Sequence, residues 1–153
     1  MARNKRSNRK TELGLMALEL ISSLALDGVD YPKEDIDQIW TMVLRNQFHD
    51  ILPGTAINEV YEVTRLEYRE AKETICKLID ARLDYLFGEG DKVTLFNPHG
   101  YTRNDVVNLG KIDAKAIQAS DGSVYAVQQT NDGAIAYVEN LPSKGYELSL
   151  IHI

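Results

Sequence analysis

Cysteine, histidine and tryptophan are scarce in this sequence, and their scarcity limits the chemistry that it can carry. The 153 residues include one cysteine (Cys76), three histidines and one tryptophan. A single cysteine excludes a disulfide within the chain and a cysteine-rich metal cluster. It also fits a reducing compartment, so the expected location is the cytoplasm.

Long hydrophobic runs are missing as well. No stretch of eighteen or more apolar residues occurs, and no apolar stretch follows the basic N-terminal residues. These features predict a soluble chain with neither a membrane-spanning helix nor a secretory signal. Hydrophobic residues nevertheless make up 44% of the chain, which is close to the usual globular proportion, so at least part of it should fold.

Positive charge is concentrated at the N-terminus, although the net charge of the chain is −6. Nucleic-acid binding is disfavoured, because no aromatic residue is interleaved with the basic ones and the rest of the chain is acidic. We interpret the cluster as a solvated helix face or a frayed tail. The five basic residues are Arg3, Lys5, Arg6, Arg9 and Lys10.

Three segments of the first 90 residues show the periodicity of amphipathic helices. In each segment, apolar residues recur at steps close to three and four, which places them on one helical face. The three helices should pack as a bundle, because only neighbouring helices can cover those faces. The predicted core positions are Leu13, Met16, Ala17, Leu20, Ile21 and Leu24; Ile36, Ile39, Trp40, Val43 and Leu44; and Ile57, Tyr61, Tyr68, Ala71, Ile75 and Leu78.

Glycine and proline residues set the expected ends of these helices. Gly28 is expected to end the first helix. Pro32 suits the first turn of the second, where its missing N–H would have no partner. Pro53-Gly54 separates the second helix from the third, for which Thr55 is the expected N-cap.

After Gly90 the pattern changes to short strands separated by turns. Predicted strands cover residues 93–96, 105–109, 111–119, 123–130 and 134–141, with hairpin turns at Asp121-Gly122 and Asp132-Gly133. A sheet of so few strands leaves a face or an edge uncovered. We therefore expect the sheet to continue beyond this sequence. The predicted fold class is α+β, with a three-helix bundle in residues 1–90 and an incomplete antiparallel β-sheet or sandwich in residues 91–153.

A polar group of residues stands just before the proline-glycine turn. If the second helix continues to Asp50, then Asn46, His49 and Asp50 share one helical face, opposite the buried Trp40. An amide, an imidazole and a carboxylate on one face would make half of a binding site. Alternatively, His49 and Asp50 only finish the helix. One histidine and one carboxylate fall short of the three or four ligands of a zinc site.

The segment Asn46-Gln-Phe-His-Asp-Ile-Leu-Pro-Gly-Thr55 resembles the hallmark segment of the middle domain of glycoside hydrolase family 38 α-mannosidases. The resemblance covers nearly the whole chain. It implies an internal piece of such an enzyme, made of the helical middle domain and the start of the C-terminal β region. The further matching segments are residues 2–12, 31–40 and 58–62 in the helical half, and residues 95–98, 103–107 and 141–146 in the β half.

This resemblance implies a retaining, metal-dependent glycosidase that removes terminal α-linked mannose from oligosaccharides or glycans. By position, His49 corresponds to a metal-binding histidine, with zinc the usual metal, and Asp50 to an aspartate that binds mannose hydroxyls. In the family, the nucleophile, the acid/base and the other metal ligands come from an N-terminal α/β domain that these residues do not include. The implied partners are a mannose-containing oligosaccharide, that catalytic domain and the rest of the β domain, with no nucleic acid or membrane.

Two hypotheses of different classes remain. The first is an enzyme fragment that is inactive alone, and the second is a non-catalytic helical scaffold or carbohydrate-binding module. Both ends of the chain look accidental: Met1 falls where the family would have an internal residue, and the last six residues, 148–153, resemble a translated sequencing-library adapter. We therefore expect the native sequence to stop near Glu147. An upstream reading frame that encodes an α/β domain would favour the first hypothesis.

Overall fold

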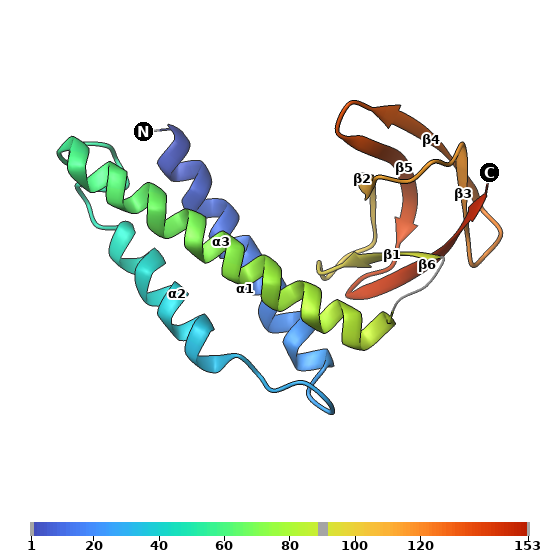
Figure 1. Ribbon diagram of the computed structural model, residues 1–153, viewed down its shortest axis with the longest axis horizontal. Helices are drawn as coiled ribbons and strands as arrows, with labels where there is room; N and C mark the ends of the chain where they lie inside the picture. Colours follow the sequence, from blue (N-terminus) through green and yellow to red (C-terminus); the bar gives the residue numbers. More distant parts are fainter. Residues whose placement is uncertain (1, 89–91, 153) are drawn as a thin grey trace. The chain divides into compact units, whose positions relative to one another are not determined.

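The chain forms two compact units, one helical and one made of β-strands (Figure 1). The computed structural model describes residues 2–88 and 92–152. The helices precede all the strands, so the predicted α+β fold class is confirmed.

The helical unit contains α1 (Ala2–Leu24), α2 (Lys33–Asn46) and α3 (Asn58–Phe87). All three helices contact one another, and α1 and α3 share the most extensive contact. Figure 1 shows α1 and α3 running in the same direction, with α2 returning between them in the chain. The predicted three-helix bundle is therefore present, although α1 begins earlier and ends earlier than the apolar pattern predicted.

The core of this unit follows the prediction at most positions of α2 and α3, but Leu44 and Ile57, also predicted for the core, are 62% and 67% exposed. Apolar residues of all three helices meet in one buried cluster, against which Trp40 packs. The indole Nε1 of Trp40 donates a hydrogen bond to Glu19 of α1 at 2.8 Å. The cluster consists of Leu15, Leu18, Ile36, Ile39, Val43, Tyr68, Ala71 and Ile75.

The predicted core face of α1 is wrong for most of its residues, although Ile21 is buried as predicted. Leu13, Met16 and Leu24 are 42%, 57% and 51% exposed, whereas Leu15 and Leu18 are fully buried. Steps of three and four fit more than one stripe of α1, and the stripe that the bundle buries also contains polar residues. Its members are Asn8, Thr11, Leu15, Leu18 and Ser22, and Ile21 is buried beside them.

Asn8 on the buried stripe is accommodated by hydrogen bonds, whereas the buried hydroxyl of Ser22 has no partner among the described residues. The Tyr68 hydroxyl of α3 donates to Asn8 Oδ1 at 3.1 Å, and Asn8 Nδ2 donates to Glu12 at 3.0 Å. Such pairing offsets the cost of burying an amide in an apolar interface. Leu13, Met16 and Leu24, on the more hydrophobic stripe of α1, remain exposed.

Burial, together with the nearby charges of Glu12 and Glu67, raises the pKa of Tyr68 from 10.0 to about 12. The folded chain thus holds the phenol proton more tightly than the unfolded chain does. This stabilisation is complete below pH 10 and is lost as the pH rises through 12, by about 2–3 kcal/mol. In Tyr68→Phe, the free energy of unfolding should fall less between pH 8 and pH 11 than in the unchanged chain. Urea unfolding at the two pH values measures this difference. An equal decline in both proteins would contradict the assignment.

The β unit is a six-stranded antiparallel sheet in the order β1-β6-β3-β4-β5-β2. Its apolar side chains form a separate core that includes Leu95, Leu109, Ile117 and Val138. The edge strands are β1 and β2, and the expectation that further strands continue the sheet stays a prediction. The strands are β1 (Lys92–Asn97), β2 (Arg103–Gly110), β3 (Ala116–Ala119), β4 (Val124–Thr130), β5 (Gly133–Leu141) and β6 (Gly145–His152).

Both predicted hairpin turns are present, between β3 and β4 and between β4 and β5. Gly133 has a φ of 142°, and a Cβ there would lie 2.6 Å from the Gly110 carbonyl oxygen, so only glycine fits.

Two predictions for the strands were wrong. The third strand is limited to Ala116–Ala119, and the sixth, Gly145–His152, was not predicted. None of the helices in residues 2–88 is long and apolar enough to cross a membrane.

Candidate functional site

His49 and Asp50 lie in the loop of residues 47–57 between α2 and α3. The helix ends at Asn46, so the prediction that it continues to Asp50 is wrong. Their side chains are 75% and 54% exposed, and His49 Nε2 lies 3.3 Å from Asp50 Oδ2. An imidazole and a carboxylate therefore stand side by side on the surface, accessible to a metal or a ligand.

The carbonyl oxygen of Asp50 organises the loop. It accepts hydrogen bonds from the backbone N–H groups of Thr55 and Ala56, at 3.1 and 2.9 Å, and from the Tyr61 hydroxyl at 3.1 Å. Gly54 turns the chain back with a φ of 103°, in the left-handed region that favours glycine. Three donors on one backbone oxygen hold this part of the loop in one conformation while leaving the Asp50 side chain at the surface.

Thr55 does not cap α3, contrary to the prediction. The N-cap position is Ile57, which makes no side-chain cap hydrogen bond. The Thr55 hydroxyl instead donates to Asp50 Oδ1 at 3.1 Å. This bond restrains the carboxylate through one oxygen, Oδ1, while the other oxygen faces His49.

Asn46 is not part of the exposed site. It is 1% exposed, and its Nδ2 donates to Glu67 Oε2 of α3 at 2.9 Å. Arg45 pairs with the other oxygen of the same carboxylate. The prediction that Asn46, His49 and Asp50 share one face is therefore wrong, because the helix ends before His49 and the two neighbours turn away from the buried amide.

Side chains of α1 hold the loop from the other side. Asn4 Nδ2 donates to the Ile51 carbonyl at 3.1 Å, and Gln47 Nε2 donates to Glu12 Oε1 at 2.7 Å. Sequence reasoning missed these supports. The available signal was the four-residue spacing of Asn4, Asn8 and Glu12, which places three polar side chains on one face of α1.

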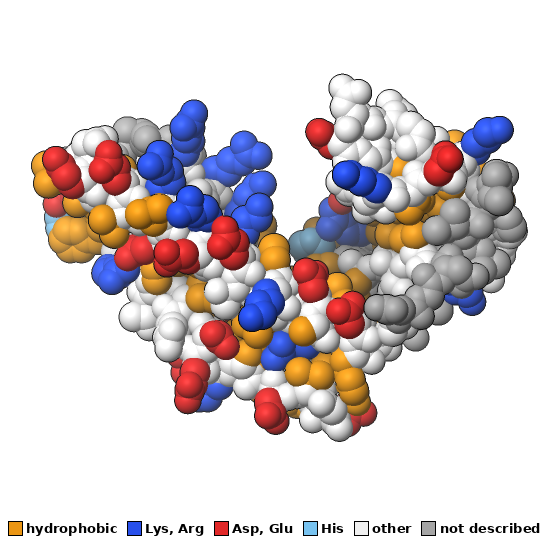
Figure 2. Space-filling view, in the orientation of Figure 1, with side chains coloured by type: hydrophobic (Ala, Val, Ile, Leu, Met, Phe, Trp, Pro, Cys, Tyr) orange, Lys and Arg blue, Asp and Glu red, His pale blue; other side chains and the backbone are white. Residues whose placement is uncertain are grey.

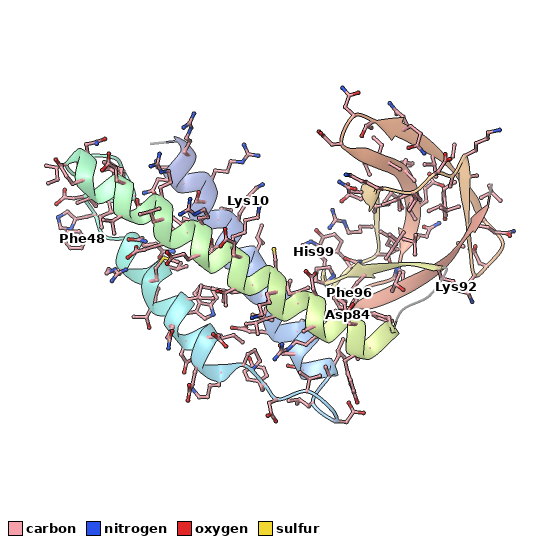
Figure 3. All side chains as sticks on the ribbon, in the orientation of Figure 1. Lys10, Phe48, Asp84, Lys92, Phe96 and His99 are labelled. Carbon is pink, nitrogen blue, oxygen red and sulfur yellow. The ribbon has the colours of Figure 1, made fainter. Side chains whose placement is uncertain are left out.

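The ring of Phe48 is the second feature that sequence reasoning missed. Phe48 is 53% exposed, and its ring centroid lies 4.0 Å from that of His49. Figure 3 shows Phe48 projecting from the end of the unit where α2 ends. The phenyl ring lies against one side of the imidazole and so limits the orientations that His49 can adopt.

The donor set is too small for a complete metal site. Within residues 2–88 and 92–152, no group of three His, Cys, Asp or Glu residues is placed to hold a metal ion. Zinc sites in proteins use three or four protein ligands. His49 and Asp50 fit one part of such a site and would need ligands from other residues.

A family model described as the α-mannosidase middle domain matches residues 1–86, which is more than half of this chain. The chain belongs to the family 38 α-mannosidases. The resemblance seen in the sequence is confirmed, and the loop that carries His49 and Asp50 lies inside the matched residues.

Curated relatives of this chain are much longer. α-Mannosidase of Saccharomyces cerevisiae is 36% identical over 91 residues, which are 56% of this chain and 8% of that protein. Alpha-mannosidase 2C1 of Homo sapiens is 36% identical over 74 residues, which are 46% of this chain and 7% of the human protein. The chain thus spans less than a tenth of the length of either relative.

Solved structures share the fold of this chain. A protein of glycosyl hydrolase family 38 from Enterococcus faecalis superposes on 99% of this chain with a TM-score of 0.75 and 18% identity, and the chain covers 24% of it. An α-mannosidase from Enterococcus faecalis V583 covers 95% of this chain with a TM-score of 0.70 and 17% identity. These two likenesses support the fold of the chain.

Proposed function

We propose that this chain is the helical middle domain and the start of the C-terminal β region of a retaining, metal-dependent α-mannosidase. Its substrates would be oligosaccharides or glycans with terminal α-linked mannose. The match of residues 1–86 to the α-mannosidase middle domain carries the proposal. The boundary between the two domains is proposed near residue 90, between the helical and the β unit.

In this proposal His49 binds the metal and Asp50 binds hydroxyl groups of mannose. The support is geometric, because both side chains are exposed on a loop whose backbone is fixed by Asp50, Thr55 and Tyr61. A neutral imidazole offers a lone pair to zinc or another divalent ion, and an ionised carboxylate accepts hydrogen bonds from sugar hydroxyls. Two adjacent residues thus have different tasks.

The metal, when bound, would supply a positive charge that orients and polarises substrate oxygen atoms. Asp50 would position the sugar through hydrogen bonds that can strengthen in the transition state. A retaining mechanism further requires two carboxyl groups about 5 Å apart across the glycosidic bond. The proposal assigns both of these groups, and the remaining metal ligands, to an α/β domain of the parent protein.

The cytoplasm is the proposed compartment, on the basis of the single cysteine, Cys76, which is a free thiol exposed on α3. The other proposed partner of the chain is the remainder of the parent enzyme. Nucleic acid and membrane have no place in this proposal.

The decisive test is the stereochemistry of the parent enzyme, obtained by extending the reading frame on both sides of these residues. The purified parent should hydrolyse an aryl α-mannoside in a metal-dependent reaction, and proton NMR should show α-mannose as the first product. Retention follows from double displacement at the anomeric carbon. A parent without α-mannosidase activity, or one that releases β-mannose first, would overturn the proposal.

The 153-residue chain alone should have no α-mannosidase activity. Without a nucleophile and an acid/base, the covalent route is absent rather than weakened. The measurement is release of aryl alcohol from an aryl α-mannoside, with and without zinc, at high chain concentration. Metal-dependent turnover by the purified chain would contradict this expectation.

A further inference from the structure

A cavity of about 450 Å³ opens between the N-terminal parts of α1 and α3. Its volume falls in the range of about 300–1,000 Å³ that is usual for small-molecule sites. Four residues of α1 and six of α3 line it, and three of them are arginines: Arg3, Arg6 and Arg65. The walls therefore come from two helices that pack firmly against each other.

The charge of this cavity is opposite in sign to that of the chain. Its lining holds Arg3, Arg6 and Arg65 against one carboxylate, Glu62, which leaves a net charge of +2 (3 − 1). The whole chain carries −6. Figure 2 shows Lys and Arg side chains gathered along one edge of the helical unit. A local excess of positive charge on an acidic protein favours a small anion over a polyanion, which the rest of the surface would repel.

The three guanidinium groups have no protein partner in the part of the chain that the structure describes. Some other cations form ion pairs, as Lys33 does with Asp37 and Arg45 with Glu67. No side-chain hydrogen bond or ion pair of Arg3, Arg6 or Arg65 occurs within residues 2–88 and 92–152. Each arginine carries five N–H donors in a planar fork that suits the oxygen atoms of phosphate.

Three other polar side chains of the cavity are held by hydrogen bonds. Glu62 accepts a hydrogen bond from Asn58 on its own helix at 3.1 Å. Tyr61 and Asn4 are tied to the loop of residues 47–57, through the carbonyl groups of Asp50 and Ile51 respectively. Part of the lining is therefore held in place by hydrogen bonds, and two of its residues also support the loop that carries His49.

We propose that this cavity binds a phosphate dianion, either as inorganic phosphate or as the phosphomonoester of a small sugar. Arg3 and Arg6 from α1 and Arg65 from α3 donate to the phosphate oxygens. Charge-assisted hydrogen bonds from arginine to phosphate are among the stronger polar contacts in proteins, and two helices contribute to the same ligand. The proposal does not depend on the activity of the parent enzyme.

Titrations of the 153-residue chain test the proposal at low ionic strength. Inorganic phosphate, mannose 6-phosphate and mannose are added in separate series, and arginine Nε–H signals are followed by NMR with calorimetry for affinity. Phosphate or the sugar phosphate should shift a small set of arginine signals with saturation, and neutral mannose should not. The compound that binds with the higher affinity, inorganic phosphate or mannose 6-phosphate, identifies the source of the ligand.

Variants separate the cavity from general charge attraction. Arg6→Gln and Arg65→Gln should each weaken phosphate binding by about fivefold to tenfold, because each loses one charged donor. The matched control is Arg69→Gln, because Arg69 is exposed one turn further along α3 and does not line the cavity. This variant should change the affinity for phosphate by less than about twofold. Circular dichroism checks that all three variants keep their helices.

Two results would overturn the proposal. One is the absence of saturable phosphate binding in the wild-type chain. The other is equal weakening by Arg65→Gln and Arg69→Gln, which would mean that phosphate responds only to the total charge of the helical unit.

Discussion

Replacing His49 by alanine in the parent enzyme should remove most of the bound metal and lower kcat/KM by more than about a hundredfold. Loss of a group that only supports a metal ligand costs about 10–100-fold, so loss of a direct ligand should cost at least as much. The folded state should be almost unaffected, because the His49 side chain is 75% exposed. Metal analysis of the purified variant, with steady-state kinetics, measures both effects.

Asp50→Asn should separate substrate binding from metal binding. The variant keeps an oxygen that can accept from the Thr55 hydroxyl, so the loop should be preserved. It replaces the ionised carboxylate, which accepts hydrogen bonds from sugar hydroxyls, by a neutral amide. This change should lower kcat/KM by about 10–100-fold with the metal retained. Metal content of the variant, measured beside its kinetics, tests this separation.

His99→Ala is the matched control for both variants, because His99 lies in the β unit between β1 and β2. It should leave metal content and kcat/KM near those of the unchanged enzyme. The competing interpretation treats His49 and Asp50 as residues that only finish a helix, and it predicts that neither substitution changes the metal content. Full metal content and normal turnover in His49→Ala would reject the site assignment.

Leu18→Ala should destabilise the helical unit by about 2–5 kcal/mol, whereas Met16→Ala should cost about 0.5 kcal/mol or less. Leu18 is fully buried against α2 and α3, so its truncation leaves a cavity. Met16 is 57% exposed on the stripe of α1 that the bundle does not bury. Urea unfolding of the 153-residue chain, followed by helical circular dichroism, compares the two variants.

Met16 and Leu18 make a stringent pair because they are two residues apart on the same helix, and sequence periodicity selected Met16 for the core. Equal losses in the two variants, or a larger loss for Met16→Ala, would mean that the exposed stripe of α1 is the one that stabilises this unit.

Much of the fold follows from local sequence. The apolar spacing of Ile36, Ile39 and Val43 predicts both the second helix and its buried face, because that segment has a single apolar stripe. Asp121-Gly122 and Asp132-Gly133 predict hairpins for a similarly local reason: glycine accepts the positive φ that such turns require. These signals depend on residues close together in the chain, so they can be recognised without the tertiary structure.

The exposure of His49 and Asp50 was expected from the sequence, but the reason was different. Helical geometry placed His49 opposite Trp40 on a continued helix, whereas the structure exposes it on a loop. The loop conformation depends on Asn4 and Tyr61, which are distant from His49 in the chain and act through backbone carbonyl groups. Hydrogen bonds of this kind leave no periodic pattern in the sequence.

The sequence by itself determined three helices followed by strands, the membership of the α-mannosidase family, and the loop segment that carries the candidate site. Only the tertiary structure decided which stripe of α1 is buried. Two stripes of α1 have compatible spacing, and the more apolar one would be selected by hydrophobicity alone. The bundle buries the other stripe, because there Leu15 and Leu18 meet the apolar faces of α2 and α3, and Asn8 finds a partner in Tyr68. Complementarity between helices decides the buried face, and that property belongs to pairs of helices rather than to any one of them.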